Sequence, residues 1–180
     1  MKNRSDETLF LDGSDSAMTH LVERYRRPLF GFLRRWCGDA HLAEDLFQET
    51  FLKLVRSRNR FDPERRFKPY VYRVALNAAH DARATRRVPL VALEGDGAPG
   101  HHPGPAETAA AREAGARVRA AIAVLPEAER LVVELRMYEG FTFREVAEAT
   151  GVEISTAKSR MVYALRRLRP ALLAFLPEGT

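Results

Sequence analysis

A proline- and glycine-rich segment divides this sequence into two parts. Residues 88–105, VPLVALEGDGAPGHHPGP, contain four prolines, four glycines, two acidic residues and no lysine or arginine. Proline and glycine interrupt regular structure, and a stretch this rich in both is typical of a linker. Neither flanking part shows the alternating apolar pattern of β-strands. The sequence therefore predicts an all-α protein with two small helical domains, residues 1–87 and 106–180, joined by a flexible linker.

Apolar residues recur at helical spacing throughout both predicted domains. Helices are expected at about 16–37, 42–58 and 69–87 in the first domain, and at about 107–124, 126–138, 142–149 and 155–175 in the second. We detect no internal repeat.

Composition excludes several classes of protein. No apolar run approaches the roughly 20 residues of a membrane-spanning helix, and the amino terminus lacks the apolar core of a signal peptide. We therefore expect no membrane insertion and a cytoplasmic location. Cys37 is the only cysteine, which excludes an internal disulfide and a thiolate-rich zinc site. The net charge of +5 favours a polyanionic partner only weakly.

The segment EVAEATGVEISTAKSRMVYALRRLR, residues 145–169, predicts two helices that are separated at Gly151, a residue that can adopt positive φ. The apolar stripe expected to pack inward on the second helix comprises Ile154, Ala157, Met161, Ala164, Leu165 and Leu168. The opposite face is small and polar at its amino end and basic beyond, and comprises Ser155, Thr156, Ser159, Arg160, Tyr163, Arg166 and Arg167, flanked by Lys158 and Arg169. Such a face suits the major groove of duplex DNA. The alternative is a solvated helical hairpin whose arginines only favour the helix carboxyl end.

The helix expected at 42–58 carries an apolar residue on its polar side. Its predicted inward stripe comprises Ala43, Leu46, Phe47, Thr50 and Leu54. Leu52 lies on the opposite side, surrounded by Asp45, Gln48, Glu49 and Arg56. An apolar centre with a charged rim is typical of a protein-binding patch. A single exposed leucine is also common on surfaces without a partner, so both interpretations remain open.

Residues 60–87, RFDPERRFKPYVYRVALNAAHDARATRR, interleave aromatic and basic side chains. The inward stripe is predicted to comprise Val71, Val74, Ala75, Ala78 and Ala82. The outward face and helix ends are predicted to present Phe67, Tyr70, Tyr72, Arg73, Leu76, Asn77, His80, Arg83, Arg86 and Arg87. Unpaired bases stack on aromatic rings while phosphates pair with cations, so this face indicates single-stranded nucleic acid. The alternative is that the tyrosines are half-buried core residues.

Three motifs in this order resemble the extracytoplasmic-function (ECF) sigma factors of the sigma-70 family. AEDLFQETFLKL (43–54) resembles the region that binds the polymerase clamp, and YVYRVALNAAHD (70–81) is similar to the promoter-melting helix. Residues 125–169, which begin LPEAERLVVELRMYEG, are similar to the carboxyl-terminal helix-turn-helix domain. The resemblance implies sigma domain 2 in residues 1–87 and sigma domain 4 in residues 106–180.

The resemblance also implies a role for each face. Asp45, Gln48, Glu49, Leu52 and Arg56 are expected to bind core RNA polymerase at the clamp helices of its largest subunit. The 67–87 face is expected to capture the melted −10 element of promoter DNA, and the 155–167 face to read the −35 duplex while its domain contacts the polymerase flap. An anti-sigma factor that covers the polymerase-binding surfaces is a further expected partner. No catalytic activity, cofactor or metal is expected.

Two other classes of function are alternatives to a sigma factor. A stand-alone helix-turn-helix regulator is the main alternative, and it would have no use for a polymerase-binding face on residues 45–56. An enzyme has little support, because the five histidines show no metal-ligand spacing and neither a phosphate-binding loop nor a Ser/His/Asp grouping occurs.

Overall fold

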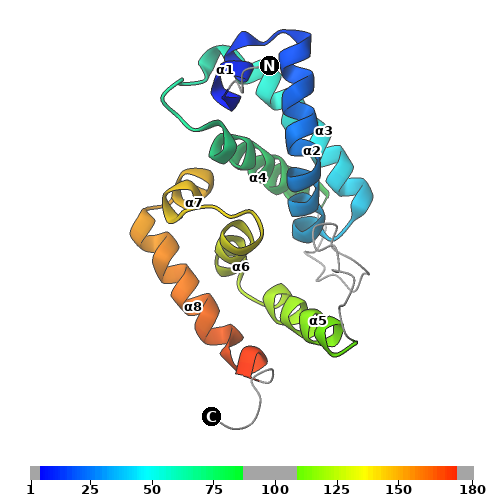
Figure 1. Cartoon of the computed structure of the whole chain (residues 1–180), viewed down its shortest axis with the longest axis vertical. Coiled ribbons are helices and arrows are strands. Elements are labelled where there is room, and N and C mark those ends of the chain that lie inside the picture. Colours follow the sequence, from blue (N-terminus) through cyan, green and yellow to red (C-terminus); the bar gives the residue numbers. More distant parts are fainter. Residues whose placement is uncertain (1–4, 87–108, 174–180) are drawn as a thin grey trace. The chain divides into compact units, whose positions relative to one another are not determined.

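The computed structural model describes residues 5–86 and 109–173, and within these ranges every regular element is a helix or helical turn (Figure 1). The described helices fall into two compact units, the first containing α1–α4 and the second containing α5, α6 and α8. The predicted all-α fold with two helical domains is confirmed. The predicted linker, residues 88–105, lies outside the described residues. No helix in the described part of the chain is both long and apolar enough to cross a bilayer.

The N-terminal unit is built on three long helices. Its elements are α1 (Asp6–Asp12), α2 (Asp15–Cys37), α3 (Ala40–Ser57), a 3₁₀ turn η1 (Arg58–Arg60) and α4 (Phe67–Arg86). α3 packs against both α2 and α4, while α1 contacts α2, η1 and α4. The helices at 16–37, 42–58 and 69–87 are thus confirmed to within two residues at each end.

Aromatic side chains fill the core of the N-terminal unit. Phe67 is fully buried, and its ring centroid lies 4.7 Å from that of Phe10 and 5.7 Å from that of Tyr25. Phe32 stacks on Trp36 with ring centroids 6.1 Å apart. The inward stripe predicted for α3 is confirmed, because all five of its residues are buried.

The short helix α1 was not predicted. Ser5 begins it by accepting a hydrogen bond from the Thr8 amide at 3.2 Å, and Gly13 ends it with a φ of 61°. Both are ordinary helix boundary signals. Seven residues provide too few turns for a clear apolar period, and an isolated helix this short is unstable in water. Its contacts with the other helices therefore decide that it forms.

The C-terminal unit has a small core between its first and last helices. Its elements are α5 (Ala109–Ala123), α6 (Glu127–Val133), a π-helical turn η2 (Glu134–Tyr138) and α8 (Ile154–Leu173), and α7 (Phe143–Thr150) lies between η2 and α8 in the sequence. The core cluster comprises Ile122, Leu125, Val133, Ala164 and Leu168. The helix predicted at 126–138 is α-helical over Glu127–Val133 and π-helical over Glu134–Tyr138.

The helical pair α7–α8 has the predicted break between its helices. Gly151 has a φ of 70°, and α7 ends at the residue before it. Thr142 and Glu145 form a capping box at the start of α7: Glu145 Oε2 accepts from the Thr142 amide at 2.8 Å, and Thr142 Oγ1 accepts from the Glu145 amide at 3.2 Å. The short turn fixes where α8 begins, one residue before the predicted start.

The inward stripe predicted for α8 is only partly correct. Ala157, Ala164 and Leu168 are buried, and Met161 packs against the core cluster. Ile154 and Leu165 are wrong as inward residues, since they are 39% and 46% exposed. The reason is that α8 packs on α5 and α6 through a narrow strip, which is filled by small and medium side chains and leaves the strip's edges exposed.

Candidate nucleic-acid interface

An open groove runs between α3 and α4 on the N-terminal unit, and we call it the α3–α4 groove. It is lined by Lys53, Arg56, Ser57, Arg60, Arg65, Tyr70, Arg73, Val74, Asn77 and Asp81. Five of these ten residues are cationic and one is acidic. The groove therefore combines positive charge with one aromatic ring and one amide.

The aromatic residue of the groove is held by the end of α3 and by the loop in front of α4. The Tyr70 hydroxyl lies 2.7 Å from Ser57 Oγ, and its ring centroid lies 5.0 Å from that of Phe61. Tyr70 is half-buried, so part of the ring packs on the core while part lines the groove. This is the amphipathic placement that allows a tyrosine to stack on a base.

The acidic residue of the groove is paired. Lys53 Nζ lies 2.9 Å from Asp81 Oδ2 and 3.7 Å from Glu49 Oε1, so it connects α4 with the outer face of α3. The pairing offsets the Asp81 carboxylate within an otherwise cationic groove. All three side chains are at least one-third exposed, so these ion pairs contribute little to stability.

The outer face of α3 presents apolar side chains to solvent. Leu52 and Val55 are 51% and 52% exposed. Asp45, Gln48 and Arg56 are also exposed and Glu49 is half-buried, as expected for a polar rim. We call Asp45, Gln48, Glu49, Leu52, Val55 and Arg56 the α3 surface. Val55 was missed from the sequence, although its i, i+3 spacing from Leu52 could have revealed it.

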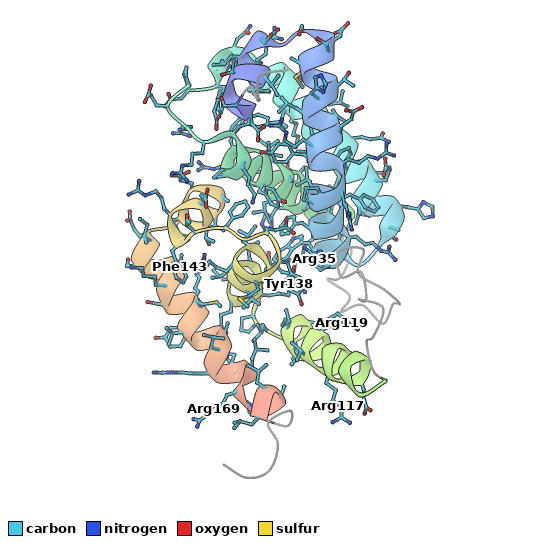
Figure 2. The ribbon with its side chains drawn as sticks, viewed as in Figure 1. Arg35, Arg117, Arg119, Tyr138, Phe143 and Arg169 are labelled. Carbon is cyan, nitrogen blue, oxygen red and sulfur yellow. The ribbon has the colours of Figure 1, made fainter. Side chains whose placement is uncertain are left out.

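The outward face of α8 is polar and basic. Ser155, Lys158, Ser159, Tyr163, Arg166 and Arg167 are exposed, while Thr156 and Arg160 are half-buried. The Ser159 hydroxyl donates to the Ser155 carbonyl at 3.0 Å. Figure 2 shows Arg169 projecting from the carboxyl-terminal part of α8, and Arg117 and Arg119 projecting from α5. Ser155, Thr156 and Ser159 lie in the first two turns of α8, so the amino end of the outward face is small and polar, as predicted.

Arg167 is less available to a ligand than its neighbours on α8. Its Nε lies 3.1 Å from Glu129 Oε2 on α6, and the Glu129 side chain is only 12% exposed. The Glu129 oxygen makes no well-aligned hydrogen bond, so the contact is chiefly one of charge. Within the C-terminal unit, Arg167 therefore helps to hold α8 on α6.

Comparisons with known proteins match both parts of the chain to one family. Sigma-70 region 2 matches residues 21–88, which include α3, α4 and the groove, and sigma-70 region 4 matches residues 121–170. The chain is 34% identical to the RNA polymerase sigma factor CarQ of Myxococcus xanthus over 91% of this chain and 93% of the relative. It is 31% identical to the ECF RNA polymerase sigma factor RpoE of Cereibacter sphaeroides, over 86% of each.

The chain belongs to the ECF sigma factors of the sigma-70 family. The fold agrees, since the structure of CnrH in complex with the cytosolic domain of CnrY is similar with a TM-score of 0.71 and 24% identity. That match covers 96% of this chain and all of the other. Sigma factors direct RNA polymerase to promoters, and that is the activity the surfaces of this sigma factor must perform.

Two residues predicted for −10 DNA are placed elsewhere in this sigma factor. Phe67 is fully buried in the aromatic core, and the Tyr72 ring packs on Phe32 of α2 at a centroid distance of 5.2 Å. Neither lines the groove, so the prediction of an outward position is wrong for both. Leu76, also predicted outward, is buried. The physical reason is that α1, α2 and α3 all contact α4, so more than one of its sides is covered.

The remaining residues predicted for −10 DNA separate into two groups. Tyr70, Arg73 and Asn77 meet in the groove. His80 and Arg83 are exposed but lie outside its lining. The side chain of Arg86 and the whole of Arg87 lie outside the described residues.

Several groove residues were missed by the sequence analysis. Lys53, Ser57, Arg60, Arg65 and Asp81 line the groove, and so does Arg56, which was predicted for polymerase. Arg60 and Arg65 belong to a basic loop that the sequence does reveal, but helical periodicity says nothing about where a loop folds. Only the packing of α3 beside α4 brings these residues to Tyr70 and Asn77.

Proposed function

We propose that this sigma factor captures the melted −10 strand of promoter DNA in the α3–α4 groove. The observation that carries the proposal is the grouping of five cations around Tyr70 and Asn77. Phosphates of a single strand pair with lysine and arginine, a base stacks on an aromatic ring at about 1–3 kcal/mol, and the amide can hydrogen-bond a base edge. Asp45, Gln48, Glu49, Leu52 and Arg56, with Val55, would bind the clamp helices of core polymerase.

We propose that α8 reads the −35 duplex from the C-terminal unit. Ser155, Thr156 and Ser159 occupy its amino-terminal turns, where a recognition helix meets base edges, and the basic residues follow. Lys158, Arg160, Tyr163 and Arg166 would reach bases or phosphates. The corresponding domain boundaries are 1–87 for domain 2, 88–105 for the linker and 106–180 for domain 4.

The activity proposed here is binding rather than catalysis, and it is exercised in the cytoplasm, where bacterial polymerase transcribes the chromosome. An anti-sigma factor is a proposed partner. One solved neighbour, with a TM-score of 0.66, is the sigma factor RpoE of Bartonella quintana in complex with the anti-sigma factor NepR. The exposed Leu52 and Val55 supply the apolar centre such a partner would cover. A stand-alone regulator would leave this face unexplained.

The test is to titrate the full-length protein against bacterial core RNA polymerase and then select promoters from a random duplex library with the resulting holoenzyme. We expect a stable one-to-one complex and a recovered sequence with two separated elements. A folded protein that does not bind core polymerase, or a holoenzyme that enriches no promoter, would contradict the proposal.

Replacing Lys158 by alanine is expected to weaken −35 duplex binding equally on all sequences. Lys158 is exposed on the flank of the outward α8 face and supplies charge rather than base-specific hydrogen bonds. The slope of log affinity against log salt should fall in magnitude by about one unit, as for the loss of one phosphate contact. The measurement is fluorescence anisotropy of holoenzyme on the selected promoter at several salt concentrations.

Arg117→Ala provides the matched control for Lys158→Ala. Arg117 is exposed on α5 and pairs with Glu113 at 2.5 Å, so its removal changes the net charge equally but on a helix other than the proposed recognition helix. Its salt slope should remain that of the wild type. Equal slopes for all three proteins would show that Lys158 contacts no phosphate.

A further inference from the structure

Helix α1 lies outside the part of the chain that matches sigma-70 region 2, which begins at residue 21. It nevertheless contacts α2, η1 and α4. Besides packing on α2, it contacts η1 and the start of α4, which lie at the two ends of the loop that supplies Arg65 to the groove.

The start of this loop is fixed by the carboxyl end of α1. Arg58 Nη1 donates a hydrogen bond to the Gly13 carbonyl at 2.8 Å. Gly13 has a φ of 61°, and a Cβ at this position would overlap the Arg58 guanidinium. Glycine therefore suits this backbone conformation, and any larger residue would be strained there and would displace the arginine.

The end of the loop is fixed by the amino end of α1. Glu7 Oε1 accepts a hydrogen bond from the Phe67 amide at 2.9 Å, so a residue 60 positions away caps the start of α4. A carboxylate is favourable there because the amino end of a helix carries partial positive charge. Partial burial acts to raise the pKa of Glu7, but the Phe67 hydrogen bond, the other hydrogen bonds it accepts and Arg66 together hold that pKa below its ordinary value.

The middle of α1 packs against the same loop. Phe10 is fully buried, with its ring centroid 5.2 Å from that of Phe61 and 4.7 Å from that of Phe67. Phe61 in turn contacts Tyr70, the aromatic residue of the groove. A chain of rings therefore connects α1 with the groove.

A separate pair of contacts fixes α1 to the scaffold. Asp6 accepts a hydrogen bond from the Tyr25 hydroxyl at 2.6 Å and pairs with Arg24, both on α2. Contacts of Asp6 thus hold α1 on α2, while contacts of Glu7, Phe10 and Gly13 hold the loop on α1. The loop contributes Arg65 to the groove, and η1 contributes Arg60.

We propose that α1 is a positioning element for strand capture, which holds η1 and the following loop in the conformation that places Arg60 and Arg65 beside Tyr70. Glu7 is its principal positioning residue. The inference rests on the proposed function of the groove. A loop ordered before DNA arrives loses less conformational entropy on binding, so fixing it raises affinity for the strand without any contact between α1 and DNA.

The test compares Glu7→Ala, which removes the hydrogen-bond acceptor, with Glu7→Gln, which keeps one. Thr8→Ala is the control, because Thr8 is exposed on α1 and its side chain bonds only to the hydroxyl of Ser5 among the contacts described. Amide hydrogen exchange is measured on each full-length protein. In Glu7→Ala, but not in the other two variants, we expect amide exchange at Phe67 and across residues 58–66 to be about tenfold faster. This is the size expected for one lost hydrogen bond to a charged group.

The functional measurement uses holoenzyme and a fork probe, the selected promoter with its −10 segment left single-stranded. Glu7→Ala is expected to bind this probe about tenfold more weakly, with Glu7→Gln and Thr8→Ala near the wild type and core polymerase affinity unchanged in all. Wild-type affinity in Glu7→Ala would overturn the inference. Faster amide exchange throughout α2 and α3 in Glu7→Ala would also overturn the inference, because α1 would then stabilise the whole unit and not the loop in particular. Failure of the proposed function would instead appear in the wild type, as no binding to the fork.

Discussion

Leu52→Arg is expected to lower the affinity of the sigma factor for core RNA polymerase by about a hundredfold or more. Leu52 is 51% exposed on α3, so an arginine is accommodated in the free protein without disturbing the core. In a complex, the side chain at the centre of an apolar contact loses its water, and an unpaired guanidinium there is costly. The measurement is a titration of labelled core polymerase at moderate salt.

The control for Leu52→Arg is Leu11→Arg on α1. Leu11 is 43% exposed, so the substitution introduces the same charge in place of a similarly exposed leucine on the same unit. Its affinity for core polymerase should stay within about twofold of the wild type, as for a surface change away from the interface. Equal losses in both variants would show that added charge, and not the α3 surface, weakens the complex.

Phe67→Ala is expected to lower the free energy of unfolding of the N-terminal unit by about 3–5 kcal/mol. The ring is fully buried between Phe10 and Tyr25, and its removal leaves a cavity that these rigid neighbours cannot fill. Trp36, the only tryptophan in the chain, stacks on Phe32 in the same unit. Its fluorescence in a urea titration therefore reports the unfolding of this unit.

Leu52→Ala, on the same unit, is the comparison for Phe67→Ala. Leu52 is 51% exposed on α3, so truncating it should change the free energy of unfolding by less than about 0.5 kcal/mol. If Phe67→Ala instead left the urea midpoint unchanged and abolished −10 strand binding, the residue would contact DNA as the sequence suggested. The two outcomes separate a core aromatic from a DNA-binding one.

Most of the local structure follows from the sequence. The inward residues of α3, from Ala43 to Leu54, were assigned from helical periodicity, and all are buried. The end of α7 at Gly151 follows from a residue that tolerates positive φ. The exposed position of Leu52 also follows from periodicity. These features depend on residues within a few turns of each other, which is the range over which sequence patterns are informative.

The sequence was less informative where a helix has neighbours on several sides. Periodicity assigns one buried stripe to α4, but Phe10 covers Phe67 from α1 and Phe32 covers Tyr72 from α2. Phe67 and Tyr72 therefore lie in the core, whereas Tyr70, the third aromatic residue of α4, lines the groove. On α8, fewer residues are buried than periodicity predicts. The strip that contacts α5 and α6 is narrower than the apolar stripe, so Leu165 stays exposed.

By itself the sequence determined two helical domains, the boundaries of their long helices and the family. Tertiary structure alone decided that α1 forms and that Lys53, Arg60 and Arg65 line one groove with Tyr70 and Asn77. The physical reason is the separation in sequence between the residues that interact. Helix formation and the choice of a buried face are set by neighbours three or four residues away, whereas the groove and the α1 contacts join side chains up to 60 residues apart, as Glu7 and Phe67 are.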